Sequence, residues 1–287
     1  MLLGYNTNGF AHHDPFEAIR VLADIGYRSV AITLDHGPLN PFVAGFDRQL
    51  EQLRQLLEKL EMRSVIETGA RFLLDPQRKH EPTLVTADPT ERARRLYFLC
   101  HAVDAARALG SDCVSLWSGA ATDDIPPEAA MDRLREGLEH VLVYAQGERA
   151  DQDDVLIGFE PEPGMLIDNM EAYAELSNRI DAPHFRLTLD IGHLHCQGEA
   201  PIERQIELWR DRLVNVHIED MRFGVHEHLM FGEGEIDFAP VIERLARIGY
   251  RDGVHVELSR HSHEAPEAAR RAFDFLAPLI AKYERGS

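Results

Sequence analysis

The sequence predicts an α/β protein built as a single (β/α)8 TIM barrel that spans residues 1–287. Short apolar segments alternate with amphipathic helical segments along the whole chain, eight of each, and this strict alternation implies parallel strands joined by crossover helices. No linker rich in Gly, Ser or Pro divides the chain. The length of 287 residues is also close to the roughly 250 residues typical of such barrels.

Each predicted element rests on local signals. The first helix has Asp14 as its capping residue, Pro15 at its first position and Gly26 at its end. The second repeats leucines at helical spacing, and the third is closed by Gly110. The predicted strands cover 2–6, 29–33, 64–68, 112–117, 155–160, 185–190, 213–218 and 253–258, and the predicted helices cover 14–26, 46–62, 90–110, 126–146, 169–180, 202–212, 238–249 and 266–283.

The longest irregular stretch, 69–89, follows the third predicted strand. Structureless loops of this length are unusual in compact domains and usually functional, so we expect a lid or rim of the site here. An open doubly wound sheet is the alternative fold. It would normally carry a glycine-rich phosphate turn after the first strand, and the segment GYNTNGF is not such a turn.

Composition favours a soluble, cytoplasmic protein that acts on small molecules. The net charge of −19 is spread along the chain, and it disfavours phosphate backbones and anionic membranes as partners. The three cysteines, Cys100, Cys113 and Cys196, show no paired spacing, which fits a reducing compartment. The first residues show no secretion signal, and no stretch approaches the roughly 18–20 apolar residues needed to span a bilayer.

Four predicted strands carry metal-ligating residue types at or near their carboxyl ends. Glu160, Asp190 and Glu257 end the fifth, sixth and eighth strands, and His217 lies in the seventh. Because strand ends converge at one mouth of a barrel, and clustered buried charge must be compensated, we expect one divalent ion there. Three carboxylates and one imidazole suit Mn²⁺, Mg²⁺ or Co²⁺, and Zn²⁺ if more histidines join. Any one of these residues alone could instead cap a helix or pair with an arginine.

Further candidate residues follow the same strands. His193 comes three residues after Asp190, and Glu67 ends the third strand. His226 and His228 have the spacing that places two side chains on one side of an extended segment. These four residues are candidates for a second metal ion or for binding substrate hydroxyls. For His226 and His228 the alternative is a solvated loop.

Three other residues have a less defined place. Trp117 ends the fourth predicted strand and either walls the pocket or packs in the core. Glu162 would share the side of Glu160 only if the strand continued, which its flanking prolines disfavour. Arg260 is a candidate contact for a phosphate, together with the segment GEG at 232–234.

The segments FEPEP, LDIGH, VHIED, FGEGEIDF and VELSR together resemble the xylose isomerase-like barrel superfamily, over nearly the whole chain. That group includes sugar phosphate isomerases and epimerases, ketose 3-epimerases, hydroxypyruvate isomerase, inosose dehydratase and endonuclease IV. By this resemblance Glu160, Asp190, His217 and Glu257 match the metal ligands, and His193 matches a substrate-binding histidine. The motifs identify the superfamily and not the substrate.

The resemblance implies a metal-dependent isomerase or epimerase of a sugar, sugar phosphate or polyol. In the ketose epimerases the metal stabilises an enediolate, and the glutamates that match Glu160 and Glu257 transfer the proton. Two positions depart from the epimerase pattern. Leu166 stands where those enzymes have a second glutamate, and Arg222 matches only loosely the arginine that follows their strand-seven histidine.

Three alternative functions remain open from sequence. A cyclitol dehydratase or lyase of the same superfamily would use a similar metal site. An endonuclease IV-like zinc phosphodiesterase would use His193, His226 and His228 as well, although Glu67 and Trp117 stand where that enzyme has histidines. The third is a barrel that binds a metabolite without catalysis. A homodimer is an expectation by analogy with other barrels of this group.

Overall fold

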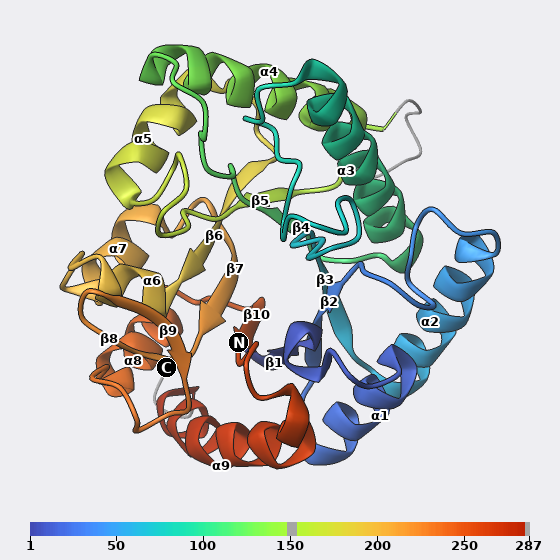
Figure 1. The fold of residues 1–287 in the computed structure, drawn as a ribbon. Helices are drawn as coiled ribbons and strands as arrows, with labels where there is room; N and C mark the ends of the chain where they lie inside the picture. The colour runs from blue at the N-terminus through green and yellow to red at the C-terminus, as the bar shows by residue number, and fades with distance from the viewer. Residues whose placement is uncertain (148–153, 285–287) are drawn as a thin grey trace.

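The structure, a computed structural model that describes residues 1–147 and 154–284, is a closed barrel of parallel strands (Figure 1). Its strands are β1 (Leu2–Asn6), β2 (Ser29–Thr33), β3 (Arg63–Glu67), β4 (Val114–Leu116), β5 (Ile157–Phe159), β6 (Phe185–Asp190), β7 (Leu213–Ile218) and β10 (Gly253–Val256). Around the barrel they pair in the order β1-β10-β7-β6-β5-β4-β3-β2, and β1 and β2 close the ring. The predicted fold class is therefore confirmed, and the open-sheet alternative is wrong.

A ring of helices covers the barrel, and each begins and ends within three residues of its prediction. Asp14, Asp88 and Asp237 cap three of these helices by accepting hydrogen bonds from backbone N–H groups of the first turn. The helices are α1 (Pro15–Ile25), α2 (Phe46–Leu60), α3 (Pro89–Leu109), α4 (Pro127–Ala145), α5 (Met170–Arg179), α7 (Ile202–Trp209), α8 (Phe238–Arg247) and α9 (Ala265–Glu284).

The sequence prediction missed several short elements that follow barrel strands. Helix α6 (Ile191–Cys196) follows β6, and an antiparallel hairpin of β8 (Asp220–Arg222) and β9 (Val225–Leu229) follows β7. Two 3-10 turns, η1 (Thr7–Phe10) and η2 (Ser262–Glu264), complete the set. The Asp220 carboxylate supports the hairpin by accepting hydrogen bonds from the backbone N–H groups of Gly232 and Ile236. Such contacts leave no periodic pattern of apolar residues in the sequence. Residues 69–88 form neither helix nor strand.

The interior of the barrel contains a layer of buried polar side chains below its mouth. The His255 ring is hydrogen-bonded to Ser29 Oγ (2.9 Å) and to Asn215 Oδ1 (2.8 Å). Glycine makes room for this ring, since a Cβ atom on Gly4 or Gly253 would lie 2.3 or 2.1 Å from it. The layer connects the hydrophobic core to the polar groups at the mouth.

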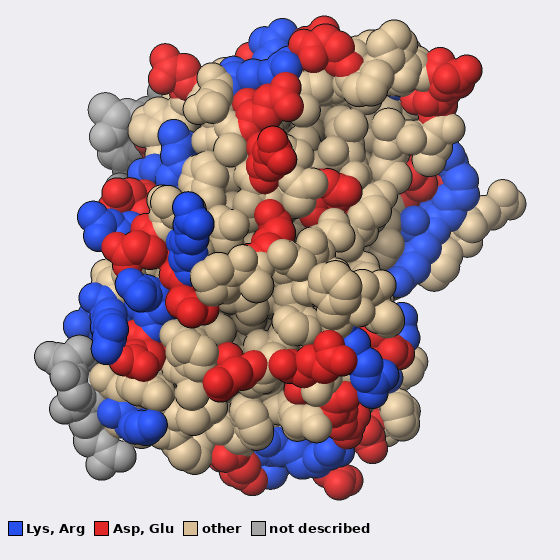
Figure 2. Space-filling view, turned by 90° about the vertical axis from the view of Figure 1, so that its left-hand side faces the viewer, with Lys and Arg blue, Asp and Glu red and all other residues tan. Residues whose placement is uncertain are grey.

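The surface of the barrel carries charges of both signs. On the side shown in Figure 2, acidic and basic side chains are interspersed and no continuous basic stripe runs across that face. Among the described residues, no helix is long and apolar enough to cross a bilayer. Cys100, Cys113 and Cys196 are all free thiols.

Candidate metal and active site

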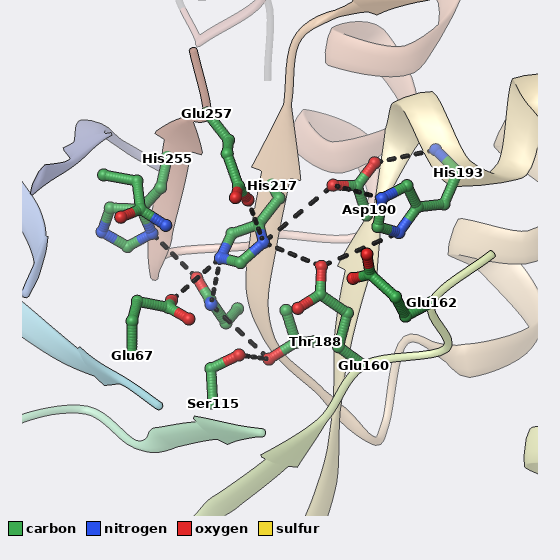
Figure 3. Close-up of polar contacts among 12 residues, drawn as sticks. Glu67, Ser115, Glu160, Glu162, Thr188, Asp190, His193, His217, His255 and Glu257 are labelled. Carbon is green, nitrogen blue, oxygen red and sulfur yellow. Dashed lines mark hydrogen bonds and ion pairs between the residues drawn. The ribbon is translucent and has the colours of Figure 1, made fainter. Parts of the chain in front are cut away.

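The four predicted metal-ligating residues meet at the carboxyl-terminal mouth of the barrel. They come from β5, β6, β7 and β10, which are neighbours in the barrel, so their side chains enter one space (Figure 3). His217 Nδ1 lies 3.0 Å from Glu160 Oε1, 3.0 Å from Glu257 Oε2 and 4.0 Å from Asp190 Oδ2. One ligand atom from each residue lies within 4.8 Å of the others. We call Glu160, Asp190, His217 and Glu257 the four-ligand cluster.

The chemistry of this cluster fits a divalent cation. Asp190 Oδ2 is buried and has no hydrogen-bond partner among the described residues, although its other oxygen caps α6 through His193 N–H at 2.8 Å. Three carboxylates this close repel one another, and removing them from water costs free energy that an ion or protons must offset. Carboxylate oxygens with one imidazole are a usual ligand set for such ions.

Glu67 orients the histidine of this cluster. Its Oε1 atom lies 2.9 Å from His217 Nε2, on the opposite side of the ring from the three carboxylates (Figure 3). A carboxylate that accepts from one ring nitrogen fixes the tautomer and leaves the other nitrogen available for a metal. The structure thus places Glu67 beside the cluster through His217 Nε2.

Burial and mutual charge shift the pKa values of this cluster. Burial raises the pKa of Glu160 to about 8, although His217 opposes the shift. Burial also acts to raise the pKa of Glu257, but the charge of His217 and its hydrogen bond outweigh that effect and hold it below the ordinary value. Burial acts to lower the pKa of His217, and the surrounding carboxylates, led by Glu160, raise it well above the usual range. Protons therefore occupy this cluster when a metal does not.

Three histidines form a second group beside the first, and we call His193, His226 and His228 the three-histidine cluster. One ring nitrogen from each lies within 4.8 Å of the others, and His193 Nε2 is 3.1 Å from His226 Nε2. Burial lowers the pKa of His193 to about 4 and also lowers that of His226, so these rings are neutral at neutral pH, the form that binds metals. His226 and His228 lie on strand β9 and not in a loop; His226 is exposed, and both residues line the cavity described next.

A cavity of about 330 Å³ opens beside the four-ligand cluster. This volume is near the lower end of the roughly 300–1,000 Å³ typical of small-molecule sites. A larger hollow of about 670 Å³, between α1 and α2, is not lined by any member of either cluster. Among the residues predicted from sequence, those that line the cavity are Glu67, Trp117, Glu160, His217, His226, His228, Glu257 and Arg260.

Three predicted residues have other surroundings. Asp190 and His193 lie just beside this cavity, on a small void under α6. Arg222 is exposed on β8 and donates to the Glu233 carbonyl at 3.0 Å, so the structure does not bring it to the cavity.

Sequence reasoning missed or discounted three acidic or amide groups at this site. Glu162 lines the cavity, with Oε1 3.7 Å from His226 Nε2, although the strand ends at Phe159. Asn8, in η1, donates to Glu257 Oε1 at 2.7 Å. Glu219 is fully buried, and neither of its carboxylate oxygens has a hydrogen-bond partner among the described residues. Glu219 follows His217 by two residues, directly after the end of β7, and that spacing was the signal available for it.

Comparison with known proteins identifies the family of this chain. The family described as xylose isomerase-like TIM barrel matches residues 19–279. The chain belongs to this family. Among curated relatives, L-ribulose-5-phosphate 3-epimerase UlaE of Shigella flexneri is 25% identical over 273 residues, which cover 93% of this chain and 90% of that protein. UlaE of Salmonella typhi is 25% identical over 274 residues, with the same coverage of both chains.

Several solved structures share this fold over nearly their whole length. A D-tagatose 3-epimerase-like protein superposes with a TM-score of 0.78 at 18% identity, covering 100% of this chain and 99% of that one. An L-ribulose 3-epimerase gives 0.77 at 19% identity, covering 99% and 96%. The IOLI protein with a binding zinc atom gives 0.74 at 19% identity, covering 99% of both chains. At these identities the likeness shows the fold alone.

Proposed function

We propose that this chain is a divalent-metal-dependent epimerase or isomerase of a sugar or sugar phosphate. One observation carries the proposal: Glu160 and Glu257 each place a carboxylate oxygen 3.0 Å from His217 Nδ1, at the end of a cavity of about 330 Å³. The UlaE relatives, named as 3-epimerases of a sugar phosphate, support the same reaction class. Proton transfer beside a carbonyl is a reaction that two such carboxylates can perform.

Glu160, Asp190, His217 and Glu257 are the residues that would hold the ion. When bound, a divalent ion supplies positive charge beside the substrate oxygens and lowers the cost of the negative charge that develops there. Glu160 follows β5 and Glu257 follows β10, and β6 and β7 separate the two strands. The two carboxylates therefore approach a bound sugar from different directions.

The chain's own residues carry the proton. One glutamate takes the proton from the carbon next to the carbonyl, and the electron pair of the broken C–H bond forms an enediolate whose charge rests on oxygen. The other glutamate returns a proton to the opposite face of that carbon, which inverts its configuration. If the proton is instead returned to the neighbouring carbon of the enediolate, and a second proton moves between the two enediolate oxygens, the product is an isomer with the carbonyl at the other carbon. Asn8 holds Glu257 in place through its 2.7 Å hydrogen bond.

Metal content and solvent exchange test this proposal. Protein purified without chelators and without added metal is measured by mass spectrometry, and we expect about one Mn, Mg or Co ion per chain. The metal-loaded protein is then incubated in D₂O with a panel of ketoses and ketose phosphates, and we expect deuterium to enter at the carbon next to the carbonyl. A protein that neither retains nor takes up metal, or that exchanges no proton with any member of the panel, would contradict the proposal.

The three-histidine cluster favours a second candidate, a two-metal site with hydrolytic chemistry. Its support is the close approach of three imidazoles beside the buried carboxylate of Glu219, whose Oε2 is 3.9 Å from His228 Nδ1. Two or more zinc ions per chain, falling by one in His226→Ala, would favour this function. A wild-type protein with a single ion would leave these histidines to bind substrate.

A further inference from the structure

Two cations line the cavity on the side opposite the four-ligand cluster. Arg71 and Lys79 belong to the loop that follows β3, and both border the cavity together with His217 and Glu257. In the closed barrel β3 is four strands from β7 in either direction, so this loop begins diametrically across the mouth from His217. We call Arg71 and Lys79 the basic end of the cavity.

Most hydrogen-bond donors of the basic end have no partner in the part of the chain that the structure describes. Arg71 donates from Nε to Asp35 Oδ2 at 2.5 Å, but neither of its Nη atoms makes a hydrogen bond within residues 1–147 and 154–284. Lys79 is exposed at the rim, and its ammonium has no hydrogen bond or ion pair in the same part of the chain. By contrast, Arg260, the other cation that lines the cavity, is paired with Glu227 at 2.7 Å. Donor groups of a guanidinium and an ammonium thus remain available to a ligand.

The backbone that presents these cations is held in an unusual conformation. Ala70, Arg71 and His80 have φ values of 55°, 31° and 68°, in the left-handed region that non-glycine residues rarely adopt. His80 pins the loop, because its N–H donates to the Arg71 carbonyl at 2.6 Å and its Nδ1 lies 2.6 Å from the Gly69 carbonyl. Backbone of this kind persists only where surrounding contacts enforce it, and it concentrates at ligand sites.

Because the protein as a whole is strongly acidic, an anionic ligand needs cationic side chains at its binding site. The net charge is −19, and such a surface repels anions unless positive groups border the site. A third cation lies behind the basic end, because the buried Arg95 stacks on Trp117, which lines the cavity, with its Cζ 5.1 Å from the ring centroid. Arg95 Nη1 has no hydrogen-bond partner among the described residues. Three cations therefore lie on this side of the cavity, together with the carboxylates of Asp35 and Glu67, while the four-ligand cluster lies on the other.

We infer that the basic end binds an anionic substituent, a phosphate or a carboxylate, on a sugar whose reacting carbons lie at the four-ligand cluster. Arg71 and Lys79 are then specificity-determining residues that select charged over uncharged sugars. The inference rests on the proposed function for the reacting end of the substrate. A planar guanidinium whose two Nη groups make no hydrogen bond to any described residue suits a forked pair of oxygens, and Lys79 adds a mobile point charge at the rim.

Anion titration of the full-length protein, as purified, tests the inference. Inorganic phosphate and acetate are the probes, and binding is followed by tryptophan fluorescence, since Trp117 lines the cavity. Lys79→Gln and Arg71→Gln are compared with wild type. Lys59→Gln, which makes the same charge change on α2 outside this cavity, is the matched control. Lys79→Arg keeps the charge and should bind like wild type.

We expect Lys79→Gln and Arg71→Gln to weaken binding of one anion about tenfold, the effect of losing one charge-assisted hydrogen bond, while Lys59→Gln changes nothing. If phosphate shows this pattern, the substituent is a phosphate, and if only acetate does, it is a carboxylate. The absence of saturable binding, or equal binding in Lys79→Gln and wild type, overturns the inference. Lys79 has no hydrogen-bond or ion-pair partner among the described residues, so this variant should fold even if Arg71→Gln does not.

The titration is independent of catalysis. It uses neither turnover nor the bound metal as its readout, and repeating it after chelator treatment separates anions bound at the basic end from anions bound by the ion. If the proposed function is wrong, the protein will bind no metal or will exchange no proton with the sugars. If this inference is wrong, anion binding will be the same in Lys79→Gln as in wild type.

Discussion

His217 Nε2 lies 2.9 Å from Glu67 Oε1, and this contact joins β7 to β3 across the mouth of the barrel. The same ring presents Nδ1 to Glu160 and Glu257 at 3.0 Å. One imidazole therefore connects the carboxylate that orients it to the carboxylates that surround the proposed ion. Glu67 is buried and reaches this position only because β3 and β7 face one another in a closed barrel.

Glu67→Gln should weaken metal binding by about 10–100-fold while the fold is kept, since carboxylates that orient metal-bound histidines have effects of this size. The reason is that a glutamine amide does not fix the His217 tautomer as a carboxylate does. The dissociation constant for Mn²⁺ is measured by calorimetry. Glu233→Gln, an exposed glutamate away from the cavity, serves as the control. Equal affinity in Glu67→Gln and wild type would remove Glu67 from this role.

His217→Ala should remove the metal altogether and keep the barrel folded. The substitution deletes the only imidazole among the four proposed ligands and leaves three carboxylates without their shared partner. Metal content by mass spectrometry and the far-ultraviolet circular dichroism spectrum check the two parts. His140→Ala, on the exposed face of α4, is the matched control. A variant with wild-type metal content would show that the ligand set is wrong.

The metal affinity should rise with pH between about 6 and 8. Burial raises the pKa of Glu160 to about 8 in the metal-free protein, so below that pH a proton occupies the carboxylate that the ion needs. The pKa of His217 is also raised, so a second proton must leave the site when the ion binds, and it too weakens metal affinity at low pH. Binding must release these protons, and each weakens affinity by up to about tenfold per pH unit below its pKa. Mn²⁺ titrations at pH 6, 7, 8 and 9 measure the slope, and an affinity independent of pH would contradict the ligand assignment.

Repeating patterns of sequence made most of the fold predictable. The local signals are apolar strand segments, helix caps such as Asp14, and polar residues at strand ends. Closure of the barrel brings the polar strand ends at Glu160, Asp190 and Glu257 together at one mouth. Hairpin β8–β9 was not predictable in this way, since it depends on hydrogen bonds from distant backbone to Asp220. The contact from Asn8 to Glu257 joins residues 249 positions apart, and only the closed barrel brings them together.

The glycines that face His255 are a test of barrel packing. Gly4→Ala should destabilise the protein by about 1–3 kcal/mol, because the new Cβ atom would lie 2.3 Å from His255 Cδ2 and overfilled cores cost this much. Chemical denaturation measures the free energy of unfolding. Gly69→Ala is the matched control, since its Cβ atom would be 3.8 Å from its nearest neighbour. An unchanged free energy in Gly4→Ala would show that His255 can move away from the barrel wall.

Asn8→Ala should lower kcat more than it raises KM. Asn8 Nδ2 donates to Glu257 Oε1 at 2.7 Å, and this hydrogen bond favours the ionised carboxylate and fixes its direction. Without it, Glu257 should become a poorly aimed base whose pKa is higher, so we expect kcat to fall by about tenfold or more. The acidic limb of the pH–rate profile should move to higher pH, because the carboxylate must be ionised to accept the proton. A purely structural role for Asn8 would lower stability without moving that limb, so comparing the pH profile with the denaturation midpoint decides between the two. Asn40→Ala, in the loop after β2 and outside the cavity, controls for the loss of an amide elsewhere.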